Sequence, residues 1–222
     1  MGQKSILTNF QKNIFFVISG ENFFRENFYF SGGTALAEFY LKHRYSEDLD
    51  FFTLKKISYS QIQKILNLKM AKMGVDNFET RAIGGTKIFF FKREKKEVVK
   101  VEFDYFPFKR LQKGKKFKGI EIDSLFDLAV NKLNTILTRR YARDYIDLYF
   151  ILRQEEYSWQ KLLNGIRKKF SWQVDPFNLA VRLGKIEELH DYPRMIKKFS
   201  RSQMIKFYQK QAIHFNQKIF KD

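Results

Sequence analysis

The sequence contains no cysteine and only three prolines among its 222 residues. The absence of cysteine excludes disulfides, thiolate zinc sites and cysteine nucleophiles, and it is typical of proteins in a reducing compartment. No apolar run approaches the roughly 20 residues that cross a bilayer. The first residues fit neither a secretory signal peptide nor a myristoylation site. We therefore expect a soluble, cytoplasmic protein that is not associated with a membrane.

Acidic residues are scarce relative to basic ones. The chain has 42 Lys and Arg against 24 Asp and Glu, which gives a net charge of +18 and an isoelectric point near 9.9. Such a charge attracts polyanions, and nucleic acid is the first partner to consider. An AT-rich coding sequence would explain the many Lys, Phe and Ile residues, but it explains the shortage of acids less well. With 44% hydrophobic residues, the chain is long enough to bury one large core or two small ones.

Hydrophobic periodicity divides the chain into a mixed first part and a helical second part. In the first part we expect strands at 28–30, 48–53, 78–82, 86–93 and 97–106, and helices at 14–18, 34–42 and 59–73. In the second part we expect helices at 124–138, 142–152 and 202–219, one capped by Ser158 and one opened by Asp175-Pro176. The segment 109–118 is rich in Lys and Arg and has no acid. We interpret it as an exposed loop or linker and as a candidate for phosphate contacts, and we place two domains at 1–120 and 121–222.

Two short patterns in the first part suggest phosphate and metal chemistry. Ser31-Gly32-Gly33-Thr34 leads into a helix, where glycines allow close approach of an anion and free N–H groups attract phosphate. Asp48 and Asp50 lie two apart on a strand, so their carboxylates share a face. Neighbouring carboxylates repel unless a cation lies between them, and Mg²⁺ prefers such oxygen ligands. The strand expected at 97–106 offers a third carboxylate, from Glu102 or Asp104, which share one of its faces.

These patterns together resemble the AbiEii/AbiGii family of nucleotidyltransferase toxins, which belongs to the polymerase-beta-like nucleotidyltransferase superfamily. The resemblance rests first on Phe30-Ser31-Gly32-Gly33-Thr34-Ala35-Leu36-Ala37, followed by His43-Arg44-Tyr45-Ser46-Glu47-Asp48-Leu49-Asp50-Phe51-Phe52. Asp127 to Leu133 resembles the third motif of the family, and Arg143 to Leu148 resembles the fourth. The motifs occur in the family's order across residues 30–152, whereas 153–222 resembles no family that we can name.

The resemblance implies an α/β (α+β) fold: a minimal nucleotidyltransferase domain with a mixed sheet flanked by helices, followed by a helical domain. It also implies a nucleotide site at Gly32, Gly33 and Thr34. The implied metal ligands, for two Mg²⁺ ions or alternatively Mn²⁺, are Asp48, Asp50 and Asp104, with Glu102 as the alternative to Asp104. From the helical domain, Lys132 and Asp144 would be required for activity, and Lys132 would contact the nucleotide.

The implied function is transfer of a nucleoside monophosphate from an NTP to an RNA acceptor, with tRNA as the leading candidate. The biological role would be that of a toxin in a toxin–antitoxin or phage-defence (abortive infection) system, with a cognate antitoxin as partner. Two alternatives stay open. In the first, the acceptor is a protein hydroxyl, on a partner or on the enzyme itself. In the second, the chain is an inactive nucleotidyltransferase fold that only binds nucleic acid.

Several of these residues also have purely structural interpretations. Asp127 follows Ser124 by three residues, which is typical of a helix-capping pair. Lys132 lies on an apolar helix stripe, where lysines often extend their charge to solvent. The many phenylalanines fit a core first and a base-stacking platform second. An internal ion pair would explain Asp147, and its candidate partners are Arg139, Arg140 and Arg143.

Overall fold

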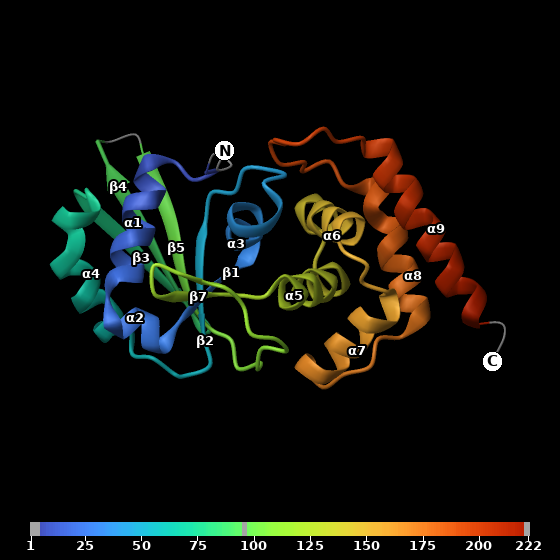
Figure 1. The fold of residues 1–222 in the computed structure, drawn as a ribbon, viewed down its shortest axis with the longest axis horizontal. Helices are drawn as coiled ribbons and strands as arrows, with labels where there is room; N and C mark the ends of the chain where they lie inside the picture. Colours follow the sequence, from blue (N-terminus) through green and yellow to red (C-terminus); the bar gives the residue numbers. More distant parts are fainter. Residues whose placement is uncertain (1–4, 95–96, 220–222) are drawn as a thin grey trace. The chain divides into compact units, whose positions relative to one another are not determined.

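The computed structural model describes residues 5–94 and 97–219 and divides the chain into two compact units. Unit 1 comprises Met1–Ser124 and unit 2 comprises Leu125–Asp222. The domain boundary predicted at residue 120 lies within unit 1, in the last strand before this division. Figure 1 shows the elements of both units and labels most of the helices and strands.

Unit 1 is built on a seven-stranded mixed sheet with the order β3-β4-β5-β2-β1-β7-β6. The strands are β1 (Tyr29–Ser31), β2 (Leu49–Thr53), β3 (Asn77–Ile83), β4 (Thr86–Arg93), β5 (Glu97–Tyr105), β6 (Lys116–Phe117) and β7 (Ile120–Ile122). The helices are α1 (Asn9–Gly20), α2 (Asn22–Asn27), α3 (Gly32–Leu36), its π-helical continuation η1 (Ala37–Leu41) and α4 (Tyr59–Met73). The mixed α/β fold expected from the sequence is confirmed.

The sheet combines parallel and antiparallel neighbours at the strands that carry the acidic residues. β2 is antiparallel to β1 and parallel to β5, and β7 is parallel to β1. In the β2–β5 register, Asp50 lies opposite Glu102 and Phe52 lies opposite Asp104. Because side chains at paired positions point to the same face, the register sets the acids of both strands side by side.

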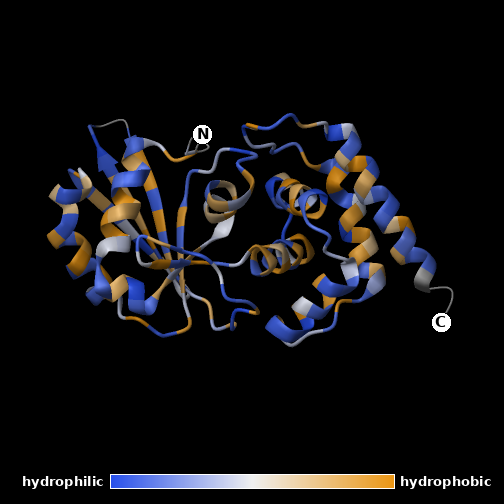
Figure 2. Ribbon diagram, in the orientation of Figure 1, coloured by the Kyte–Doolittle hydropathy of each residue, from blue (hydrophilic) through white to orange (hydrophobic). Residues whose placement is uncertain are grey.

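The opposite face of this sheet holds the core of unit 1. Alternate strand residues, among them Phe51, Phe89 and Phe103, are fully buried with α1 and α4 residues in one cluster. The rings of Phe51 and Phe103 stack with centroids 5.3 Å apart. Figure 2 shows the resulting alternation of apolar and polar residues along the strands. The phenylalanine excess therefore builds the core, as expected from the sequence.

The basic segment 109–118 is not a linker between domains, contrary to one of its two predicted interpretations. Its end forms β6, which pairs with β7 and completes the sheet of unit 1. The backbone N–H of Ile122 also donates to the carbonyl of Lys115 at 2.8 Å. These pairings form a short hairpin. Its strands contain too few apolar residues for hydrophobic periodicity to predict them.

Unit 2 is helical in the described residues. Its elements are α5 (Leu125–Thr138), α6 (Ala142–Gln154), α7 (Trp159–Phe170), α8 (Pro176–Gly184), the 3₁₀ turn η2 (Lys185–Glu188) and α9 (Arg201–Ile219). The predicted caps are confirmed: Ser158 Oγ accepts from the Lys161 N–H at 3.1 Å, and Asp175 Oδ1 accepts from the Asn178 N–H at 2.7 Å. None of the helices in 5–94 and 97–219 is long and apolar enough to cross a membrane.

Candidate functional site

Four carboxylates and one lysine gather on the sheet face that lies opposite the phenylalanine core. Asp48 immediately precedes β2, Asp50 lies on it, and Glu102 and Asp104 lie on the neighbouring β5. All four are partly exposed. The two predicted aspartates and both candidates for the third carboxylate therefore belong to one cluster. The register places Glu102, rather than Asp104, directly opposite Asp50.

Crowding of these acids changes their protonation. Burial, reinforced by the negative charges of Glu102, Asp48 and Asp104, raises the pKa of Asp50 from 3.8 to about 7. Burial also raises the pKa of Asp104 to about 6, although a hydrogen bond from Thr86 Oγ1 opposes the rise. A carboxyl has such a pKa when water and nearby positive charges do not fully stabilise its ionised form. The cluster therefore favours additional positive charge.

Lys100 is the cation that the structure places inside this cluster. Its Nζ lies 2.7 Å from Asp48 Oδ2 and 2.9 Å from Glu102 Oε1. Burial opposes ionisation of this lysine, but its hydrogen bonds to the two acids outweigh burial and raise its pKa. One lysine balances only part of the charge of four carboxylates, which explains why Asp50 still titrates near neutrality.

The chemistry of this cluster fits a divalent cation, although its side chains are not arranged as ligands. In the described part of the chain, no group of three or more His, Asp or Glu residues is positioned to hold a metal ion. Asp48 is instead paired with Lys100. The donor set consists of carboxylate oxygens on adjacent strands, which Mg²⁺ prefers. Burial and the neighbouring acids raise the pKa of Asp50 even with Lys100 present, so a further cation would stabilise its charged form.

The Gly-Gly turn is explained by what a side chain at each position would meet. Gly32 has φ +73°, and a Cβ there would overlap the carboxylate of Asp50. A Cβ at Gly33 would overlap the guanidinium of Arg44. Both glycines therefore bring the start of α3 against charged groups that any larger residue would displace. The turn predicted to bind phosphate lies next to the metal-ligand candidate Asp50.

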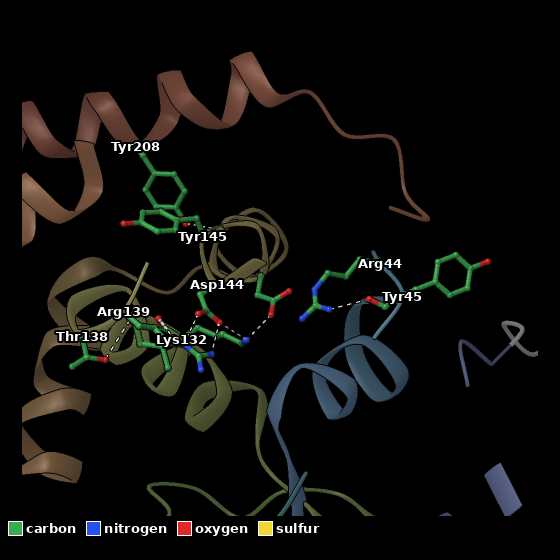
Figure 3. Close-up of polar contacts among 10 residues, drawn as sticks. Arg44, Tyr45, Lys132, Thr138, Arg139, Asp144, Tyr145 and Tyr208 are labelled. Atoms are coloured by element: carbon green, nitrogen blue, oxygen red, sulfur yellow. Dashed lines mark hydrogen bonds and ion pairs between the residues drawn. The ribbon is translucent and has the colours of Figure 1, made fainter. Parts of the chain in front are cut away.

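Thr34 ties this turn to the acidic strand. Its side chain is fully buried, and its hydroxyl donates to the backbone carbonyl of Asp48. The residue predicted to bind nucleotide thus holds the first aspartate in place. Arg44, which is 3% exposed, donates from Nη1 to the carbonyl of Tyr45 at 2.9 Å, as Figure 3 shows. Its guanidinium beside Gly33 supplies a positive charge at the turn.

Substitution of Gly32 tests this close approach. We expect Gly32→Ala to destabilise the protein by about 2–4 kcal/mol, because alanine is strained at positive φ and its methyl group displaces Asp50. Gly74→Ala is the matched control, since Gly74 has φ +69° but nothing within 4 Å of the added methyl group. Urea unfolding of both variants measures the difference. Equal destabilisation by the two substitutions would contradict a role for the contact with Asp50.

In unit 2, Lys132 is buried in an ion network rather than extended to solvent. It is 6% exposed, and its Nζ lies 2.8 Å from Asp144 Oδ1 and 2.7 Å from Asp147 Oδ2. Arg139 Nε lies 2.8 Å from Asp144 Oδ2. Figure 3 shows Lys132 and Arg139 converging on Asp144. The ion pair predicted for Asp147 exists, and Lys132 from α5 is a partner in it that the sequence analysis did not consider.

The electrostatics of this network depend on all of its members. Burial disfavours the charged form of Asp144, but the charges of Lys132 and Arg139 outweigh burial and lower its pKa. Asp144 therefore stays ionised, and Lys132 has two buried negative neighbours. The network supplies a structural reason for Lys132, in addition to the catalytic one that the resemblance implies.

Asp127 forms a buried ion pair that the sequence did not predict. It lies in the first turn of α5, and its Oδ1 is 2.7 Å from Nζ of Lys169 at the end of α7, with both side chains fully buried. Lys169 is the last residue of the basic run Arg167-Lys168-Lys169. The ion pair joins residues far apart in sequence, so no local pattern could reveal it. A buried pair of this kind depends on both partners, because loss of either leaves an uncompensated charge.

The comparisons with known proteins place the chain in a class. The family model described as "Nucleotidyl transferase AbiEii toxin, Type IV TA system" matches residues 17–211. The chain therefore belongs to the AbiEii family, as its motifs suggested, and it is classed as a nucleotidyltransferase. A family of type IV toxin–antitoxin nucleotidyltransferases implies an antitoxin partner and a nucleotide substrate.

Individual proteins are similar to this chain in sequence or in fold. An uncharacterised protein of Aquifex aeolicus, aq_aa25, is 29% identical over 150 residues, which cover 65% of this chain and 66% of that protein. A candidate nucleotidyltransferase from H. pylori has a solved structure with a TM-score of 0.62 at 18% identity, covering 100% of this chain and 98% of that one. JHP933 from Helicobacter pylori gives 0.59 at 20% identity, over 96% and 93% of the two chains. At these identities, the two structures show that the fold is shared.

Proposed function

We propose that the protein is a Mg²⁺-dependent enzyme that transfers a nucleoside monophosphate from an NTP to an RNA, with tRNA as the first acceptor to test. In this reaction an acceptor hydroxyl oxygen forms a bond to the α-phosphorus. The bond from the α-phosphorus to the bridging oxygen breaks, and pyrophosphate leaves with that oxygen. The hydroxyl proton passes to a carboxylate of the cluster or to water.

The observation that carries this proposal is the crowded set of carboxylates on β2 and β5 beside the Gly-Gly turn. Asp48 and Asp50, with Glu102 or Asp104, would hold the metal. Bound Mg²⁺ would neutralise phosphate charge and lower the pKa of the attacking hydroxyl. Gly32 and Gly33 bring the start of α3 against Asp50 and Arg44, so a triphosphate bound at this turn would lie beside a metal-ligand candidate and a guanidinium.

Positive charge supports the choice of a nucleic acid as acceptor. The net charge of +18 favours contacts to phosphate, which dominate the affinity of such complexes. Arg44 at the turn is suited to phosphate, because a guanidinium donates two parallel hydrogen bonds. The family resemblance further implies that Lys132 and Asp144 act in transfer. As a toxin that modifies RNA, the protein would act in the cytoplasm, in an abortive infection or similar defence system with its antitoxin.

The acceptor is tested by incubating the protein with Mg²⁺, each α-³²P-labelled NTP in turn and total tRNA. We expect label on ribonuclease-sensitive material with the parent protein and none with Asp48→Ala, because the variant lacks a metal ligand. Label on a protein band that resists ribonuclease would show a protein acceptor instead. RNA labelling that persists in Asp48→Ala would contradict the assignment of the metal site.

A further inference from the structure

Unit 1 carries a second charged feature, on the edge of the sheet formed by β6. Lysines and phenylalanines are interleaved there, and we call this set the lysine–phenylalanine surface. Its members are Lys113, Lys115, Lys116, Lys118, Phe16 and Phe117. All four lysines are exposed, and the two rings are partly open to solvent, with 42% of Phe16 and 37% of Phe117 exposed. Segment 109–118 has no acidic residue.

The surface is built into the fold. The rings of Phe16, on α1, and Phe117, on β6, lie with centroids 6.1 Å apart. Lys118 Nζ lies 5.6 Å from the Phe16 ring centroid. Lys115 is held by its backbone carbonyl, which accepts from Ile122. A Cβ at Gly114 would overlap the backbone of Ile122. The cations and rings are therefore presented from a fixed backbone.

The turn of the β6–β7 hairpin places a lysine where it is conformationally unfavourable. Lys118 has φ +51° and Gly119 has φ +88°, and the two residues connect paired positions Phe117 and Ile120. Positive φ at both central residues is typical of a type I′ turn, which favours Asn, Asp or Gly at the first position. A lysine at this position makes the turn less stable than asparagine or glycine would, and it places a positive charge at the tip of the hairpin.

We infer that the lysine–phenylalanine surface is where the RNA acceptor docks, with lysines against phosphates and the two rings against unpaired bases. The inference rests on the proposed function for the identity of the acceptor. A basic surface with exposed aromatic rings is the arrangement that binds single-stranded nucleic acid. Lysine is depleted in interfaces between proteins, so a surface dominated by lysine favours RNA over the antitoxin as its occupant.

The direct test compares tRNA affinity across a salt series for the parent, for K113Q/K116Q/K118N and for K64Q/K72Q/K206Q. The second triple variant removes the same charge from exposed lysines elsewhere, so it controls for net charge. We expect the first variant to bind tRNA about tenfold more weakly at 100 mM salt. Its slope of log affinity against log salt should fall by about 2, because each lost phosphate contact removes somewhat less than one from the slope. The control should stay within about twofold of the parent.

Single substitutions separate binding from folding. Lys118→Asn should leave the melting temperature unchanged or raise it, since asparagine suits the turn, and yet it should weaken tRNA binding two- to threefold. Phe16→Leu keeps an apolar side chain but removes the ring, and we expect weaker binding to tRNA with no change in the salt slope. Equal loss of affinity in both triple variants, or an unchanged salt slope in K113Q/K116Q/K118N, would overturn the inference.

Kinetics distinguish a failure of this surface from a failure of the proposed function. In K113Q/K116Q/K118N we expect the KM for tRNA to rise about tenfold while the KM for NTP stays unchanged. A parent protein that labels no RNA would contradict the proposed function, and the binding series would still test the surface. A parent that labels RNA, together with a triple variant of unchanged KM for tRNA, would contradict the surface alone.

Discussion

Asp50→Asn is expected to reduce nucleotidyl transfer by at least about 10³-fold and, at the same time, to make the folded protein more stable at pH 8. The loss of activity follows from removal of a negative oxygen ligand at the centre of the carboxylate cluster. The gain in stability follows from the raised pKa of Asp50, which burial and its acidic neighbours bring to about 7. The same crowding that fits the cluster for a cation thus destabilises the metal-free fold.

The direction of the pH dependence follows from proton binding. The folded state holds the Asp50 proton up to about pH 7, whereas the unfolded chain releases it near 3.8. Stability from this group is therefore complete below pH 3.8 and is lost as the pH rises toward 7. The two pKa values set an upper limit of about 4 kcal/mol, and since Asp50 is partly exposed we expect about 2 kcal/mol.

Thermal unfolding in EDTA measures this effect at pH 4 and at pH 8. Asp50→Asn should raise the melting temperature at pH 8 by several degrees and change it little at pH 4. Glu26→Gln, which removes an exposed acid from the same unit, should leave it unchanged at both. A melting temperature that falls at pH 8 in Asp50→Asn would show that the carboxylates are not crowded as described.

Lys132→Met is expected to destabilise the protein by about 3–5 kcal/mol, because it leaves Asp144 and Asp147 buried without the cation that lies within 2.8 Å of both. Chemical denaturation measures the loss. Lys168→Met, at an exposed position of α7, is the matched control and should change stability by less than about 0.5 kcal/mol. A stability of Lys132→Met equal to that of the control would contradict the buried network.

The double variant K132M/D147N separates the structural role of Lys132 from a role in transfer. Neutralising Asp147 removes one of the two buried negative charges that lose Lys132, so we expect it to restore part of the lost stability. If Lys132 also acts on the nucleotide, as the family resemblance implies, nucleotidyl transfer stays low in the double variant although its stability is partly restored. Recovery of transfer together with stability would show that the role of Lys132 is structural.

Most elements of the fold could be predicted from the sequence, because local signals define them. The strand at 86–93 and the helix at 59–73 agree with β4 and α4 at both ends. Ser158 and Asp175 mark helix starts by the hydrogen bonds that their side chains accept. The hairpin of β6 and β7 was missed, since β6 has only Lys116 and Phe117 and β7 joins the sheet by pairing with β1, far earlier in the chain.

The site was predictable to the extent that its residues lie within one motif. The spacing of Asp48 and Asp50 indicates a shared face without any knowledge of the sheet, and Arg44 lies in the same quoted stretch. Lys100 was missed because its role depends on the register between β2 and β5, which no local pattern gives. The partnership of Asp127 with Lys169 was missed for the same reason, since it joins two helices.

The fate of the two ends of the triphosphate tests the proposed reaction most directly. Parallel incubations with Mg²⁺ and tRNA would use the same NTP, labelled with ³²P at the α-phosphate or at the γ-phosphate. Nucleotidyl transfer predicts α-label on the RNA and γ-label released as pyrophosphate, with neither change in Asp50→Asn. Appearance of the γ-label on RNA would indicate phosphoryl transfer, and RNA free of both labels would contradict an RNA acceptor.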